Sequence, residues 1–201
     1  MDRLGGSILS FSGDAITCWF DGEVSPPDAA LRALTCSFAL QTAMGAFERV
    51  TLPNGDTVRL SLKAAVASGD ARRLLVGDPD VLVMDVLAGA TLTRMAQAQS
   101  NTTSGEVVSD ERTVELLPGI CDIAEWRQDD ESDAQFAVIR QLHQIAPSSP
   151  WEDLEADAIT PEQIRSWMLP ALYERQDVSS TELRPAVALF VSFDGIDYDN
   201  D

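Results

Sequence analysis

Side chains near the start of the chain alternate with a period of two, which is typical of paired β-strands. Two such runs, residues 8–12 and 15–20, flank a turn at Ser12-Gly13-Asp14. Gly13 can adopt a positive φ and Asp14 can close a tight turn, so the pattern predicts a β-hairpin. Asp14 is then either a turn residue or a carboxylate held at the edge of a cleft towards a cation or a phosphate.

A helix is predicted after the hairpin, where apolar residues recur at helical spacing. Pro26 and Pro27 precede it, and Asp28 can cap its first turn. The stripe that we expect to be buried consists of Ala29, Ala33, Cys36, Leu40, Ala43, Met44 and Phe47.

Short elements follow one another over the next seventy or so residues. They are a turn at 52–57, a strand at 58–67, a hairpin at 71–89, a helix at 90–99 and one or two short strands at 105–117. The order β-β-α-β-β-α predicts an α+β fold with a mixed sheet and helices on one side.

The composition of the chain changes at Pro118. Residues 118–149 are acidic and irregular, which predicts a linker, and residues 134–146 predict one helix that carries a surface histidine, His143. A second helix is predicted to begin at Thr160 and to end or kink at Pro170.

The apolar run at residues 182–193 shows little alternation, which predicts a central strand buried on both faces. Because it stands close to the end of the sequence with no sheet around it, we expect the chain to be a piece of a longer one.

The charge excludes several kinds of partner. The net charge is −19, from 33 acidic and 14 basic residues, so the chain should repel nucleic acids and anionic membranes.

We find no apolar run of about 18 residues and no signal peptide, which predicts a soluble, cytoplasmic protein. The three cysteines, Cys18, Cys36 and Cys121, lack metal-binding spacing and are interpreted as small core residues.

Three segments in this order resemble the class III adenylate and guanylate cyclase catalytic domains, most closely the tandem soluble adenylyl cyclase type. They are GGSILSFSGDAI at 5–16, the stretch from VRLSLKAAVASGD to TLTRMAQAQ at 58–99, and STELRPAVALFVSF at 180–193. The resemblance implies three parts: residues 1–117 as the later two-thirds of a first, partial ferredoxin-like cyclase domain, residues 118–180 as an acidic linker with helices between domains, and residues 181–201 as the first strand of a second cyclase domain.

The resemblance also implies a reaction. In this family two domains face each other, and their cleft binds ATP or GTP with two Mg²⁺ or Mn²⁺ ions; the product is a 3′,5′-cyclic monophosphate, and pyrophosphate leaves. By resemblance, Asp14 is one of two metal carboxylates, Phe11 and Gly13 lie at the nucleotide, and Arg94 is the catalytic arginine of an Asn-x-x-x-Arg pair.

Several positions depart from the family pattern. Ala90 replaces the asparagine of that pair, Ser10 stands where a lysine is frequent, and the strand bearing the first metal carboxylate is absent. We therefore expect a nucleotidyl cyclase by family that is inactive as this chain alone. The alternatives are a non-catalytic cyclase-like module for regulation or dimerisation with a second cyclase domain, in cis or in trans, and an unrelated acidic α+β protein in which Asp14 is only a turn residue.

Overall fold

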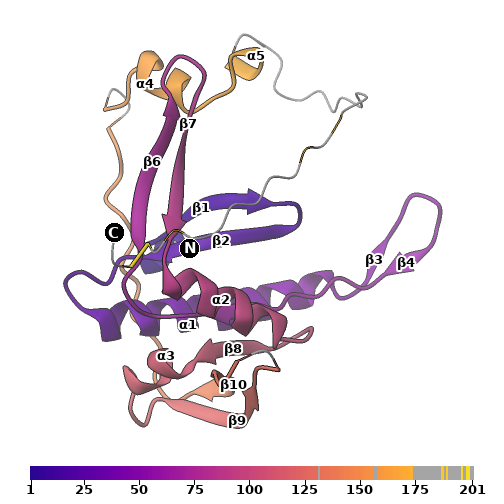
Figure 1. The fold of residues 1–201 in the computed structure, drawn as a ribbon. Coiled ribbons are helices and arrows are strands. Elements are labelled where there is room, and N and C mark those ends of the chain that lie inside the picture. The colour runs from indigo at the N-terminus through magenta and orange to yellow at the C-terminus, as the bar shows by residue number, and fades with distance from the viewer. Residues whose placement is uncertain are drawn as a thin grey trace. The chain divides into compact units, whose positions relative to one another are not determined.

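A computed structural model of the chain describes residues 1–130, 132–155 and 158–173, together with residues 187, 189, 196, 198 and 199. Figure 1 shows the order of the elements. The chain divides into two units, Met1–Ala71 with Gly89–Glu152, and Arg72–Ala88 with Asp153–Asp201.

The first unit is built on a four-stranded sheet with the strand order β5-β8-β10-β9. Its strands are β5 (Ala64–Val66), β8 (Val107–Asp110), β10 (Gln135–Leu142) and β9 (Cys121–Gln128). β5 pairs with β8 in parallel, and the other two pairings are antiparallel. The prediction of an α+β fold with a mixed sheet is thus confirmed.

Two helices cover this sheet, one on each face. α1 (Pro26–Met44) places Leu31 and Leu34 in a cluster with Val107, whereas α2 (Ala90–Ser100) places Ala98 in a second cluster with Val108. Successive strand residues point to opposite faces, so the two clusters lie on opposite faces of the sheet. The expectation of helices on one side is therefore wrong, because β8 and β10 are apolar at consecutive positions and need cover on both faces.

The α1 helix differs in detail from its prediction. Its N-cap is Ser25, whose hydroxyl accepts a hydrogen bond from the backbone N–H of Asp28 at 3.3 Å. Of the expected stripe, Ala29 and Cys36 are buried, but the later members are not, and Leu34 is the fully buried residue that the stripe omits. The helix is apolar around much of its circumference in this region, so spacing alone does not select the buried face.

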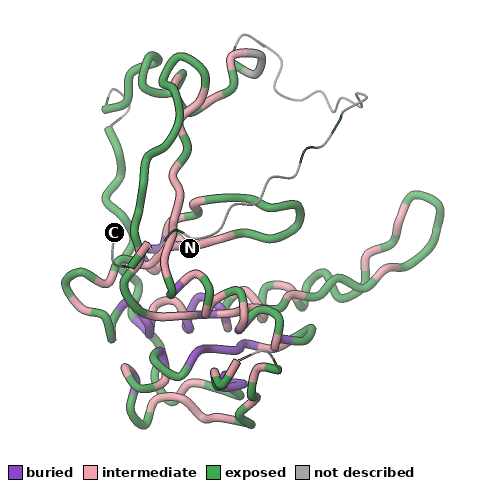
Figure 2. The backbone as a smooth tube through the Cα atoms, viewed as in Figure 1, coloured by how far each residue is buried: buried purple, intermediate pink, exposed green. Residues whose placement is uncertain are grey.

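The predicted N-terminal hairpin is confirmed. β1 (Gly6–Ser12) and β2 (Ala15–Phe20) pair antiparallel and form a sheet of their own. A second small ribbon, β3 (Val50–Thr51) with β4 (Thr57–Val58), surrounds the predicted turn at 52–57. Figure 2 shows that the buried residues gather on β8, β10 and the first half of α1, while the hairpin tips are exposed.

Residues 118–149 do not form the expected linker. They form β9 and β10, which belong to the main sheet, and the predicted helix at 134–146 is strand β10 over most of its length. Phe136 to Ile139 are four consecutive buried apolar residues, which suits a central strand covered on both faces. His143 lies just after β10 and is exposed, as predicted for a surface histidine.

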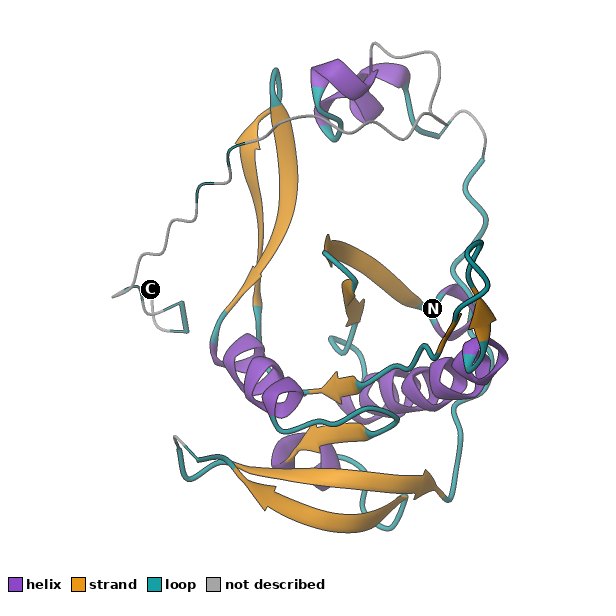
Figure 3. Cartoon of the chain, turned by 90° about the vertical axis from the view of Figure 1, so that its right-hand side faces the viewer, coloured by secondary structure: helices purple, strands orange, loops and turns teal. Residues whose placement is uncertain are grey.

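Short helices complete the first unit: η1 (Asp2–Leu4), η2 (Gly45–Phe47) and α3 (Glu111–Glu115). Figure 3 distinguishes the helices, strands and loops of the chain by colour.

The second unit contains the predicted hairpin, β6 (Arg72–Asp78) paired with β7 (Leu82–Ala88). It also contains α4 (Pro161–Ser166) and α5 (Pro170–Tyr173). Thr160 caps α4 as predicted, in a reciprocal capping box with Gln163.

The strand predicted at 182–193 lies outside the described residues, except for Val187 and Leu189, which are 99% and 84% exposed. No helix in the described part of the chain is long and apolar enough to cross a membrane.

Candidate functional site

The tip of the β1–β2 hairpin carries three of the four residues that the sequence singles out. Ser12 pairs with Ala15, so Gly13 and Asp14 alone form the turn. Gly13 has a φ of 62°, which a two-residue hairpin turn with glycine at its first position requires.

Asp14 is exposed. Phe11, which lies in β1 three residues before Asp14, has 74% of its surface exposed. No hydrogen bond or ion pair from the Asp14 carboxylate to another described residue is found. The structure therefore presents a carboxylate without a described partner, a glycine with positive φ and an aromatic ring together at one solvent-exposed end of the hairpin.

Arg94, the fourth predicted residue, is held inside the first unit. It projects from α2, and its Nε donates to Oδ2 of Asp110 at 2.8 Å. Its Nη2 donates to the carbonyl oxygen of Ser68 at 2.8 Å and to Oγ1 of Thr91 at 3.1 Å. The described interactions of Arg94 thus join α2 to the end of β8 and to the segment after β5.

Asp110 is the centre of this buried network, with 1% of its surface exposed. Besides Arg94, its carboxylate accepts hydrogen bonds from the backbone N–H and the hydroxyl of Thr113 and from the backbone N–H of Ser68. It is also the N-cap of α3. The carboxylate of Asp110 thus joins α2, α3 and the segment after β5, so the network is structural.

Gly69 shows how closely this network is packed. A Cβ built at Gly69 would lie 2.8 Å from Nη2 of Arg94 and 2.8 Å from Oγ1 of Thr91, and its φ is 149°. Glycine suits this position after β5 because its φ is positive and because the Arg94 and Thr91 side chains occupy the space of a Cβ.

Sequence reasoning missed Asp110 and Ser68. The pattern Ser-Asp-Glu-Arg-Thr at 109–113 contains an N-cap signal that could have placed Asp110 at the start of a helix. Nothing in the spacing links Asp110 to Arg94, because their contact depends on how α2 packs on the sheet.

The described residues do not by themselves fit a pair of divalent metal ions. They contain no group of three or more histidine, cysteine, aspartate or glutamate side chains that could hold a metal ion. Asp14 stands alone at its turn, and Mg²⁺ is usually held by one or two carboxylates together with substrate phosphates. A metal site that includes Asp14 therefore needs ligands from elsewhere.

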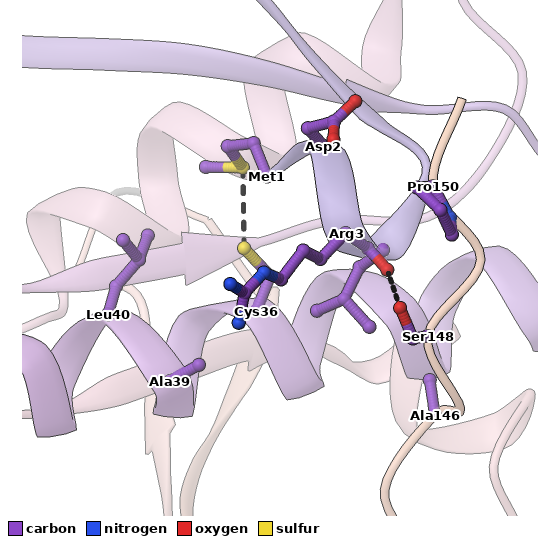
Figure 4. Close-up of a pocket in the computed structure, with 10 residues that line it drawn as sticks. Met1, Asp2, Arg3, Cys36, Ala39, Leu40, Ala146, Ser148 and Pro150 are labelled. Carbon is purple, nitrogen blue, oxygen red and sulfur yellow. Dashed lines mark hydrogen bonds between the residues drawn. The ribbon is translucent and has the colours of Figure 1, made fainter. Parts of the chain in front are cut away.

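A pocket of about 900 Å³ lies between η1, α1 and residues 146–150 (Figure 4). Met1, Arg3, Cys36 and Leu40 are among its lining residues, with the Cys36 Sγ 3.3 Å from the Met1 Sδ. None of the predicted site residues lines it, and its wall is mainly apolar.

A bidentate ion pair lies away from the hairpin tip. Arg127 of β9 donates from Nη1 and Nη2 to the two carboxylate oxygens of Glu106, at 2.8 and 2.7 Å. These hydrogen bonds lower the pKa of Glu106 to about 2 from an ordinary value of 4.5, and they raise the pKa of Arg127.

Burial raises the pKa of the Cys18 and Cys121 thiols, so neither is an activated nucleophile.

No family model matches the sequence, and no curated protein matches it. Solved structures do match. The guanylyl cyclase Cya2 is 20% identical with a TM-score of 0.58, over 72% of this chain and 76% of that chain. The guanylate cyclase domain of RhGC from Catenaria anguillulae, solved in complex with GTP, is 18% identical with a TM-score of 0.54, over 70% and 75% of the two chains.

The adenylyl cyclase CyaB from P. aeruginosa is 15% identical with a TM-score of 0.54, over 68% of this chain and 72% of that one. The chain is therefore structurally similar to class III adenylyl and guanylyl cyclase catalytic domains over about 70% of its length. The resemblance read from the sequence is confirmed at the level of the fold.

Proposed function

We propose that this chain carries a class III cyclase-type domain that acts together with a second cyclase domain. The joint reaction converts ATP or GTP to its 3′,5′-cyclic monophosphate and pyrophosphate. The observation that carries the proposal is the position of Asp14, an exposed carboxylate without a partner among the described residues, at the tip of a hairpin in a cyclase fold.

The partner domain has to supply what this chain lacks. Asp14 is one carboxylate, whereas the family's chemistry uses two Mg²⁺ or Mn²⁺ ions, and the described residues form no cluster that could bind them. We expect the chain alone to be inactive and Asp14, with Phe11 and Gly13 beside it, to face a nucleotide only when a second domain covers the hairpin tip.

The strands β9 and β10 change the proposed domain boundaries. We place the end of the first cyclase-type domain near Glu152, where the compact unit ends, rather than at residue 117. The linker then begins after Glu152, and residues 181–201 remain a prediction for the first strand of a second domain.

A reconstitution assay tests the proposal. The purified chain is incubated with MgATP, MnATP, MgGTP or MnGTP, alone and with a class III domain that carries a metal carboxylate and base-recognition residues but is inactive by itself. We expect no cyclic nucleotide from the chain alone, product from the mixture, and a loss of about a hundredfold or more with Asp14→Asn.

Asp56→Asn is the matched control, because Asp56 is also an exposed carboxylate in a turn between two short strands. It should leave the activity of the mixture unchanged. Product from the chain alone, or a mixture that is indifferent to Asp14→Asn, would contradict the proposal.

A non-catalytic cyclase-like module is the second candidate, and the state of Arg94 favours it. Arg94 donates hydrogen bonds to Asp110, Ser68 and Thr91. Ala90 stands where the cyclase family has an asparagine. In that case the chain would bind the partner domain and change its activity, while Asp14→Asn would have no effect on either.

A further inference from the structure

Arg32 of α1 holds the base of the β1–β2 hairpin at both of its ends. Its Nη1 donates to the carbonyl oxygens of Leu4 and Gly5, both at 3.1 Å, just before β1 begins. Its Nη2 donates to the carbonyl oxygen of Asp21 at 2.8 Å, just after β2 ends. One planar guanidinium therefore joins the entry and the exit of the hairpin to the helix.

The Arg32 side chain is itself held in place. Its Nε donates to Oδ2 of Asp28, one turn earlier in α1, at 2.8 Å, and the side chain is only 13% exposed. Its guanidinium carbon lies 6.0 Å from the centre of the Phe20 ring. Phe20 packs closely on its strand partner Gly6, where a Cβ would lie 2.6 Å from two ring atoms. The base of the hairpin is thus a packed junction with Arg32 in it.

The outer part of the hairpin has no comparable support. Every residue from Ser10 to Ile16 is exposed. Trp151 adds a hydrogen bond from its Nε1 to the carbonyl oxygen of Gly6 at 3.3 Å, but this contact also lies at the base. A hairpin of two strands is only marginally stable by itself, so we expect the contacts at its base to set the direction in which the tip points.

The length of the hairpin magnifies any movement at its base. A strand rises by about 3.3 Å per residue, so the turn at Asp14 lies about 20 Å along β2 from Phe20. A rotation of about 10° at the base then moves the tip by roughly 3.5 Å. A displacement of only about 1 Å can cost a hundredfold in rate when a reacting group has to be aligned.

We propose that Arg32 is a positioning residue for Asp14. By joining Leu4, Gly5 and Asp21 to α1, it fixes the direction of the hairpin and thereby the place of the carboxylate at its tip. The step from this position to a reaction rate rests on the proposed function, whereas the fixing of the hairpin by Arg32 does not.

Hydrogen exchange of the full chain tests how Arg32 holds the hairpin. Arg32→Lys keeps the positive charge, but its single nitrogen cannot span the acceptors on both sides of the hairpin. Backbone amides at 6–8 and 18–20 should exchange at least about tenfold faster, while those of β8 and β10 stay unchanged. A loss of overall stability would instead accelerate exchange throughout the first unit.

The reconstituted mixture tests the consequence for Asp14. Arg32→Lys should lower kcat by about tenfold or more. Because Arg32 acts through Asp14, adding Arg32→Lys to Asp14→Asn should cause no further loss, within about twofold. Arg140→Lys is the matched control, because Arg140 of β10 also pairs with a carboxylate, that of Asp122. It should leave both the exchange of the hairpin and kcat unchanged.

Unchanged exchange at the hairpin base in Arg32→Lys overturns the proposal, as does faster exchange spread evenly over the first unit or an equal effect of Arg140→Lys. In an active mixture, an unchanged kcat, or a loss that multiplies with that of Asp14→Asn, also overturns it. A mixture that makes no product contradicts the proposed function alone, and hydrogen exchange still decides whether Arg32 holds the hairpin.

Discussion

Asp110 has almost no solvent-exposed surface, so its carboxylate relies on protein groups for its hydrogen bonds. Arg94 is the only cation among its described hydrogen-bond partners, and the remaining donors are a hydroxyl and two backbone N–H groups. Removing the cation therefore leaves a buried carboxylate without charge compensation, which is more costly than losing one hydrogen bond.

Arg94→Met should destabilise the fold by about 3 kcal/mol, because it preserves most of the side-chain volume and removes the charge. Urea unfolding followed by circular dichroism measures the change. The exposed pair of Arg140 with Asp122 is the comparison, and Arg140→Met should cost no more than about 1 kcal/mol. Equal costs for the two variants would show that the Arg94 pair is not a buried structural pair.

The Glu106–Arg127 pair predicts a pH dependence of stability. The folded-state pKa of Glu106 is lowered from 4.5 to about 2, so the pair stabilises the fold above about pH 4.5 and loses its effect as the pH falls towards 2. Glu106→Gln should cost about 1–2 kcal/mol at pH 7, a discounted value because the pair is partly exposed.

The difference in unfolding free energy between the unaltered chain and Glu106→Gln should shrink between pH 4.5 and pH 2. Glu155→Gln, at an exposed position outside any helix or strand, should show a difference near zero throughout this range. A Glu106→Gln difference that stays constant with pH would argue against the bidentate pairing.

At the scale of elements, the stability of α1 depends on the residues at its N-terminus. Ser25 satisfies a backbone N–H of the first turn, and Pro26 and Pro27 fill positions where no hydrogen bond is lost. Ser25→Ala should cost about 1 kcal/mol of unfolding free energy, measured by thermal or urea unfolding. Thr42→Ala, near the exposed end of the same helix, should change it by less than about 0.5 kcal/mol. A cost for Thr42→Ala as large as that for Ser25→Ala would contradict the capping role.

The sequence was informative where a local signal decides the structure. Gly13 and Asp14 mark the hairpin turn, Thr160 marks the start of α4, and both are found where the pattern predicts them. It failed at 135–142, because an apolar run of four residues is compatible with a helix or a buried strand, and the neighbouring strands β8 and β9 make the choice.

The same division applies to the candidate site. Phe11, Gly13 and Asp14 are close in sequence, so their proximity at the hairpin tip could be predicted. The surroundings of Arg94 could not, because Ser68 and Asp110 reach it from two other elements through tertiary packing. The joint role of the four predicted site residues stays a prediction, because it requires a second cyclase domain.

At the scale of the whole molecule, the first unit ends at Glu152, and the next described residues, 153–155, lie outside any helix or strand. Glu152 and Glu155 are exposed, whereas Glu125 lies in the paired strand β9. Proteases prefer exposed segments that are not held by backbone hydrogen bonds. A protease specific for glutamate should therefore cut at Glu152 or Glu155 well before Glu125, and mass spectrometry of the fragments identifies the order. Early cleavage at Glu125 would show that β9 is not part of the sheet.

The parallel pairing of β5 with β8 also has a consequence for how the chain folds. Ala64 must find Val107 across an intervening hairpin and helix, whereas β9 and β10 meet across a short connection. Closing the longer loop costs more entropy, so we expect the antiparallel pair to form before the parallel pair. During translation, β5 leaves the ribosome seconds before its neighbour has been synthesised, and in that interval a chaperone or another nascent chain can reach its backbone.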